Sequence, residues 1–176
     1  MYSLEYLEEL KALHQDKKRP KGFGGKVKDL GDFYKWIQYW QPKDCLDYGC
    51  GKGVILAHLK EEFSHIIFQG YDPALDMWKQ RPDKIFEMIF CNDVLEHVEP
   101  NFIKEVLEDI NQLTTNYVWL RIDTLPARKK LSDGRNAHLI IKNKEWWLKT
   151  IESHVEGTVV YSDLNKKGKL DIAIEK

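Results

Sequence analysis

Hydrophobic positions at the start of the chain repeat with a helical period. Leucine recurs at every third residue from Leu4 to Leu13, which predicts an amphipathic helix over residues 3–14. A loop rich in Lys, Gly and Pro follows it. A second predicted helix ends at Pro42 and has one apolar face, formed by Leu30, Phe33, Ile37 and Trp40.

Beyond Pro42 the hydrophobic pattern alternates between strands and helices. The predicted strands span residues 45–48, 66–72, 85–92, 117–123, 158–162 and 170–174, and the predicted helices span 53–63, 100–113 and 143–153. Such alternation is typical of a mostly parallel sheet with helices on both faces. The link between the last two strands is too short for a parallel crossover, so they are predicted to form an antiparallel hairpin. The fold class is therefore α/β.

Length and composition limit the further choices. A chain of 176 residues is predicted to form one domain over 1–176, with a helical extension at 1–42 and the sheet core at 43–176. The formal net charge of −1 argues against nucleic acid as the main partner. Three cysteines, an acidic N-terminus and the lack of any long apolar stretch predict a cytoplasmic protein that does not enter a membrane.

The first predicted strand leads into a glycine-rich loop, Leu46–Gly53 (LDYGCGKG). In an open parallel sheet, ligands bind beyond the carboxyl ends of the strands, and glycines there let the backbone turn sharply beside a ligand. A dinucleotide-binding fingerprint would need Gly or Ala where this chain has Val54. A phosphate-binding P-loop would need Ser or Thr after Lys52, where Gly53 stands instead.

Three motifs carry a resemblance to a known family. The loop Leu46–Gly53 resembles motif I of class I S-adenosylmethionine-dependent methyltransferases, Tyr71–Pro73 resembles their second motif, and Asn92–Val98 is similar to the segment after their fourth strand. The chain as a whole, including Asp133–Leu139, looks like the compact methyltransferases of tailed phages and environmental sequences. The resemblance implies a Rossmann-like fold with S-adenosyl-L-methionine as cofactor.

The resemblance also implies roles for single residues. Asp47 would receive the cofactor's ammonium group, and Asp72 would accept hydrogen bonds from both ribose hydroxyls. The alternative for Asp72 is an Asp that starts a turn before Pro73. The implied cofactor-binding residues are Asp47, Gly49, Gly51, Gly53, Asp72, Asn92 and Asp93.

One departure from the family concerns the region after Asp72. The family usually has another strand and helix there, whereas this chain has only the twelve residues 73–84. We therefore expect a sheet shortened by one strand–helix unit and an adenine site that is more open. The side chains expected to pack on the adenine ring are Ala74, Leu75, Met77 or Trp78.

Three residues are candidates for the general base that an acceptor hydroxyl or amine would need, namely His97, His138 and Asp123. Each also has a structural interpretation: His97 as a loop brace, His138 as a surface residue at a strand end, and Asp123 as a turn cap. The oxygen and nitrogen atoms of Asp93, Glu96 and His97 could also hold a divalent ion, but the spacing lacks a second ligand pair, so no metal is expected.

Other segments suggest how an acceptor is held. Of the adjacent Trp146 and Trp147, one is expected to pack on the sheet while the other lines a cleft or rim. In the family an N-terminal extension covers the cofactor, and the candidates for its hinge are Phe23, Gly24 and Gly25. Basic clusters that favour an acidic or phosphorylated acceptor, or are simply solvated, lie at 17–19 with Lys21 and at 128–130.

The sequence thus predicts a methyltransferase that acts on a small or surface-displayed oxygen or nitrogen acceptor. A non-catalytic methyltransferase-fold subunit that binds a partner remains an alternative, because the cofactor site is shortened. A nucleic-acid methyltransferase is a further alternative. Against it, the Asn/Asp-Pro-Pro-aromatic sequence of DNA amino-methyltransferases is replaced here by Asn92–Leu95 (NDVL).

Overall fold

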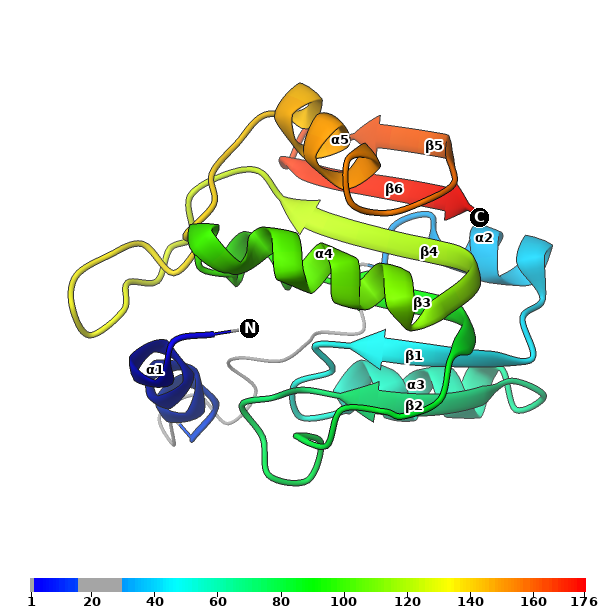
Figure 1. Cartoon of the computed structure of the whole chain (residues 1–176), viewed down its shortest axis with the longest axis horizontal. Coiled ribbons are helices and arrows are strands. Elements are labelled where there is room, and N and C mark those ends of the chain that lie inside the picture. Colours follow the sequence, from blue (N-terminus) through cyan, green and yellow to red (C-terminus); the bar gives the residue numbers. More distant parts are fainter. Residues whose placement is uncertain (1, 16–29) are drawn as a thin grey trace.

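The fold is built on a single twisted sheet. The structure is a computed structural model and describes residues 2–15 and 30–176. The strands of these residues form one six-stranded sheet in the order β2-β1-β3-β4-β6-β5 (Figure 1). The strands are β1 (Asp44–Tyr48), β2 (Ile67–Tyr71), β3 (Phe86–Asn92), β4 (Thr114–Asp123), β5 (Thr158–Leu164) and β6 (Lys169–Glu175).

Strand direction follows from the connections. The strands from β1 to β4 pair in parallel, because a helix or long loop returns the chain to the same end of the sheet each time. By contrast, β6 runs antiparallel to both β4 and β5, as predicted from the short link between the last two strands. All four parallel strands therefore end at the same edge of the sheet, which is where ligands bind in such folds.

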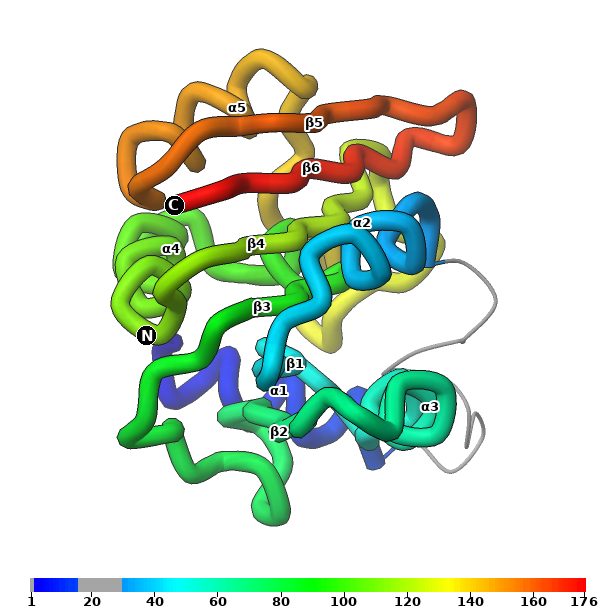
Figure 2. Tube along the Cα trace, turned by 90° about the vertical axis from the view of Figure 1, so that its right-hand side faces the viewer, coloured from blue at the N-terminus to red at the C-terminus, as the bar shows by residue number. Residues whose placement is uncertain are grey.

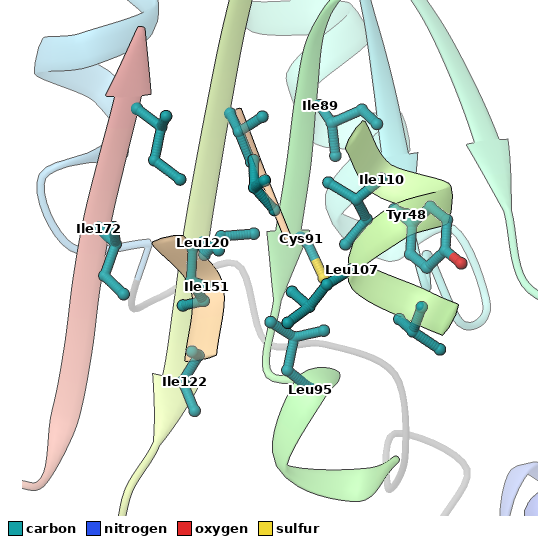
Figure 3. Close-up of a cluster of buried hydrophobic side chains, with 14 of the residues drawn as sticks. Tyr48, Ile89, Cys91, Leu95, Leu107, Ile110, Leu120, Ile122, Ile151 and Ile172 are labelled. Atoms are coloured by element: carbon teal, nitrogen blue, oxygen red, sulfur yellow. The ribbon is translucent and has the colours of Figure 1, made fainter. Parts of the chain in front are cut away.

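Helices cover both faces of the sheet. On one face lie α4 (Ile103–Gln112) and α5 (Lys144–Glu152), and on the other lie α2 (Phe33–Trp40) and α3 (Val54–Glu62) (Figure 2). Figure 3 shows the core under α4 and α5, in which Cys91 and Leu120 of the sheet meet Leu107 of α4 and Ile151 of α5. A second core under α2 and α3 centres on Phe33, Phe90 and Trp119. The central strands are buried on both faces and consist of apolar runs for that reason.

The remaining helix lies at the carboxyl edge. The helix α1 (Leu4–Gln15) lies beyond the ends of β1 and β2 (Figure 1). A small third cluster joins Tyr6 and Leu10 of α1 to Ala74, Leu131 and Ala137. The helix α1 therefore covers this edge of the sheet, whereas Phe23, Gly24, Gly25 and the basic residues 17–19 and 21 lie outside the described residues.

The predicted elements agree with the structure, apart from the starts of two of them. The strand expected over 117–123 is β4, which already begins at Thr114. The helix expected over 100–113 begins only at Ile103, after two short 3-10 turns, η1 (Leu95–His97) and η2 (Pro100–Phe102). The extended backbone of Glu99 separates the two turns, and the φ of −112° at Phe102 separates η2 from the helix. Residues 72–85, all of which are described, contain no strand or helix, so β2 is an edge strand and the sheet is shortened as expected.

Among the described residues, no helix combines the length and the apolar character that crossing a bilayer requires. The cysteines Cys45, Cys50 and Cys91 are all buried and form no disulfide.

Candidate functional site

The glycine loop after β1 forms the floor of the candidate site. Gly49 has a φ of +80°, and a Cβ atom there would lie 2.4 Å from Cγ2 of Val94. Its N–H donates to the carbonyl oxygen of Tyr71 at 2.7 Å, and the N–H of Cys50 donates to the same oxygen at 3.1 Å. The loop is therefore held against the end of β2, in a conformation that only glycine adopts without strain.

Asp72 is fixed beside this loop by two backbone hydrogen bonds. Its Oδ2 accepts from the N–H of Gly51 and its Oδ1 accepts from the N–H of Ala74, both at 2.9 Å. The carboxylate is 7% exposed. Because each carboxylate oxygen can accept two hydrogen bonds, both oxygens keep accepting capacity for a ligand. The turn-starting role and the ligand-binding role weighed for Asp72 are therefore compatible.

Asp47 supplies a buried acceptor within the same region. Its side chain is 3% exposed, and Oδ2 makes no hydrogen bond to any residue that the structure describes. Burial, together with the nearby charge of Asp72, raises the pKa of Asp47 to about 8. Such a carboxyl group is stabilised in its ionised form by a ligand that brings a positive charge or hydrogen-bond donors.

The side chains of Asn92 and Asp93, at the end of β3, point in different directions. The buried Oδ1 of Asn92 has no hydrogen-bond partner within residues 2–15 and 30–176. Asp93, which has a φ of +54°, instead turns its carboxylate toward β6, where Oδ1 accepts from Nζ of Lys169 at 2.8 Å. Asp93 is thus linked by an ion pair to Lys169 at the start of β6.

Lys169 links two acids at the ends of different strands. Its Nζ lies 2.8 Å from Asp93 and 3.0 Å from Oδ2 of Asp123. Partial burial lowers the pKa of Lys169, but the attraction of Asp93 and the hydrogen bonds to both acids outweigh it, and the pKa is raised overall. Lys169 was not among the predicted site residues, because it lies 46 or more positions along the chain from either partner.

The two candidate histidines lie together. The rings of His97 and His138 are 4.8 Å apart between centroids and nearly perpendicular, at 80°. The Nδ1 atom of His97 bonds to the carbonyl oxygen of Ala137 at 2.7 Å, and that of His138 bonds to the carbonyl oxygen of Leu125 at 2.5 Å. Burial lowers the pKa of His97 to about 4, which keeps its ring neutral at physiological pH.

Glu96 lies directly beneath these histidines and is fully buried. Its Oε1 accepts from the N–H of Asp123 at 2.9 Å. Burial and the charge of Asp93 raise the pKa of Glu96 well above its usual range. In the sequence Glu96 is grouped with Asp93 and His97 as a candidate metal ligand, but Asp93 turns its carboxylate toward Lys169 instead.

The helix α1 covers this set of side chains. The hydroxyl of Tyr6 donates to the carbonyl oxygen of His97 at 2.6 Å, and the hydroxyl of Ser3 donates to Glu99 at 2.8 Å. The pKa of Tyr2 is raised well above its usual range by burial and then by the nearby charge of Asp72. Tyr2 packs against the core under α4 and α5 and against the cluster that contains Tyr6, a position that the sequence did not predict.

A shallow groove lies beside the covered site. It has a volume of about 290 Å³ and is lined by Pro100, Leu139, Ile140, Ile141, Lys142 and Trp146. Trp147, by contrast, is fully buried in the core, so the adjacent tryptophans are divided as expected between packing and a cleft. The basic residues 128–130 belong to the loop before the groove. Met77 is 72% exposed, whereas the ring of Trp78 packs beside Gly53 and Gly70.

Comparison with known proteins places this architecture among methyltransferases. Residues 16–163 match the family described as "Methyltransferase domain". The chain is similar to the 1,6-didemethyltoxoflavin-N1-methyltransferase of Burkholderia thailandensis, solved with 1,6-didemethyltoxoflavin and S-adenosylhomocysteine. The TM-score is 0.69 and the identity 15%, over 98% of this chain and 89% of that one.

Two further solved structures share the fold. One is DhpI in complex with SAH, with a TM-score of 0.60 and 15% identity over 95% of each chain. The other is the magnesium protoporphyrin IX methyltransferase ChlM of Synechocystis with bound SAM, with a TM-score of 0.56 and 13% identity over 82% of this chain and 75% of that one. No curated protein sequence matches the chain significantly.

Proposed function

Because the chain belongs to the methyltransferase domain family, we propose that it transfers the methyl group of S-adenosylmethionine to an oxygen or nitrogen atom of a small or surface-displayed acceptor. The observation that carries the proposal is the carboxylate of Asp72 at the end of β2. The N–H groups of Gly51 and Ala74 hold it in place, and each of its oxygens can still accept another hydrogen bond.

The residues present fit this donor. Its ammonium group matches the buried Oδ2 of Asp47, and its two ribose hydroxyls match the two oxygens of Asp72. Gly49, Gly51 and Gly53 bring main-chain atoms rather than side chains to the ligand. Asn92 offers its amide oxygen, which has no hydrogen-bond partner among the described residues. Asp93 instead points toward Lys169, on the side of the site where we expect the methyl acceptor to bind.

When bound, the donor supplies a methyl group on a positively charged sulfur. The chain's own residues must then orient the acceptor, exclude water and take up the acceptor's proton. We assign the proton to one of three groups, His138, His97 or Asp123. Asp123 is held by Lys169, while His97 and His138 face each other under α1.

The groove beside Trp146 and the basic residues 128–130 favour a small acceptor with an aromatic or acidic part. The net charge of −1 disfavours nucleic acid. We place the reaction in the cytoplasm, because the three buried thiols form no disulfide.

Calorimetric titration of S-adenosylmethionine and S-adenosylhomocysteine into the purified protein tests the proposal. We expect micromolar binding that Asp72→Asn weakens at least 100-fold. The matched control is Asp76→Asn, because Asp76 is exposed and pairs only with Lys79 among the described residues. NADH serves as a negative ligand. Wild-type protein that binds neither compound would leave the non-catalytic, partner-binding subunit as the better interpretation.

A further inference from the structure

Three side chains with metal-ligating atoms converge at the end of β3. Glu96 and His97 come from the turn η1, and His138 comes from the loop 41 residues further along. One ligand atom from each of the three lies within 4.8 Å of the others. The segments that carry them are joined by backbone hydrogen bonds as well, because the N–H of Ile140 donates to the carbonyl oxygen of Glu96 at 3.0 Å.

Both histidines are oriented in the same way. A carbonyl oxygen can only accept a hydrogen bond, so the bonds to Ala137 and Leu125 require a proton on each Nδ1. In the neutral rings the lone pair then resides on Nε2. Metal-binding histidines almost always have this arrangement, in which the second nitrogen donates to a carbonyl or carboxylate and fixes the tautomer.

Glu96 supplies the independent observation that points to a cation. It is fully buried, and its Oε2 makes no hydrogen bond to any part of the chain that the structure describes. A carboxylate in such a place is costly unless a positive charge offsets it. Lys169 also attracts Glu96, but its Nζ is bonded to Asp93 and Asp123, so one positive charge faces three acids and leaves a net negative charge at this place.

We propose that Glu96, His97 and His138 bind a divalent transition-metal cation, with Zn²⁺ as the ion that suits them best. Two imidazoles and one carboxylate form a common set in catalytic zinc sites, which leave a coordination position open for a further ligand. Imidazole nitrogens disfavour Mg²⁺ and Ca²⁺. Metal–ligand bonds of about 2.0–2.2 Å place two ligands of a tetrahedral ion about 3.4 Å apart, so ligand atoms separated by up to 4.8 Å must approach by up to about 1.4 Å. His138, which is only half-buried, has room to rotate.

The N–H of Asp123 donates to Glu96, so a cation bound to Glu96 would lie close to Asp123 at the end of β4. A cation there holds an acceptor oxygen and makes its proton easier to remove. Since both histidines then act as ligands, Asp123 is left to take that proton. This catalytic role rests on the proposed function, whereas the binding of the cation does not.

The test uses the full chain after treatment with a chelator. Calorimetric titration with Zn²⁺, and with Co²⁺ followed by visible absorption, is expected to show one saturable ion per chain. We expect His138→Ala and Glu96→Gln each to weaken Zn²⁺ binding at least tenfold and to change the Co²⁺ spectrum. His154→Ala is the matched control, because His154 lies near Glu108 on α4 and outside the cluster.

The outcomes separate the two proposals. The cation site is overturned if no ion saturates, or if His138→Ala binds Zn²⁺ as tightly as the wild type does. Thermal unfolding of each variant, measured without metal, shows whether Glu96→Gln has altered the fold, and His138→Ala at its half-buried position tests the site independently. Titration of S-adenosylmethionine into the metal-free protein tests the proposed function alone, so either proposal can fail while the other stands.

Discussion

The two halves of the candidate site are built in different ways. The donor half, at the ends of β1 and β2, consists of Asp47 to Gly53 and Asp72, two short segments in which backbone groups hold the side chains. The acceptor half, at the ends of β3 and β4, draws its side chains from turns, loops and strands spread from Asp93 to Lys169. The donor half therefore depends on local backbone geometry, and the acceptor half on tertiary contacts.

From this difference we predict how substitutions in each half affect the binding of the methyl donor. A change in the glycine loop acts through conformation and should disturb donor binding directly. A change in the acceptor half acts through charge pairs and should leave donor binding intact. Four variants test this division, and they are described in decreasing order of the effect we expect.

The largest effect concerns the pH dependence of stability at the donor half. The folded-state pKa of Asp47, about 8, exceeds its unfolded value of 3.8, so the folded protein holds an extra proton between these pH values. Stability therefore falls as the pH rises through this window, by about 4 kcal/mol between pH 4.5 and 7.5 at about 1.4 kcal/mol per pH unit. We expect Asp47→Asn to lose this slope. Urea unfolding across the pH range measures it, and an unchanged slope in Asp47→Asn would contradict the assignment. Asp76→Asn should keep the slope.

The next effect concerns the glycine loop. Gly49→Ala places a Cβ atom 2.4 Å from Cγ2 of Val94, in a backbone conformation with φ +80°. We expect a loss of about 3 kcal/mol in the free energy of unfolding, together with weaker donor binding. Adding Val94→Ala should restore the part caused by the clash and leave the backbone strain. A Gly49→Ala variant as stable as the wild type would show that the loop can relax.

A smaller effect is expected at the acceptor half. Lys169→Met leaves Asp93 and Asp123 without their shared cation, at a cost of about 2 kcal/mol, because the pair is only partly buried. The dissociation constant of S-adenosylmethionine should change less than twofold. Calorimetry on this variant, and on Lys167→Met as an exposed control, decides the matter. A tenfold loss of donor affinity would refute the division into two halves.

The smallest effect concerns α1. Tyr6→Phe removes the hydrogen bond to the carbonyl oxygen of His97, which is worth about 1 kcal/mol. We expect the amide protons of α1 to exchange several times faster, while those of β3 and β4 keep their protection. Hydrogen exchange followed by mass spectrometry measures this. Equal acceleration in α1 and in the sheet would mean that the helix and the sheet open together.

The predictable part of the molecule is the part that local sequence controls. Periodicity and residue type predicted the alternation of strands and helices, the hairpin and the glycine loop. They also predicted that one of Trp146 and Trp147 packs in the core while the other lines a groove. The late start of α4 was missed, because Pro100 favours the first turn of either helix type.

The acceptor half was only partly predictable. His97, His138 and Asp123 were named singly, but their proximity depends on how the loop after β4 folds back over η1. Lys169 and Glu96 acquire their roles only through partners that are distant in sequence or through burial. The contribution of Tyr2 and Tyr6 depends on where α1 docks, which no local pattern specifies.

The small cluster that seats α1 also has a consequence for how such a protein can change over time. Tyr6, Leu10, Ala74, Leu131 and Ala137 form a unit separate from the two cores that hold the sheet together. Substitutions at Tyr6, Leu10, Leu131 and Ala137 can reshape the cover and the loop beneath it with little cost to the sheet. Ala74 is the exception, because its N–H holds the Asp72 carboxylate. New acceptor preferences are therefore accessible in small steps, while the half that holds the methyl donor is left unaltered.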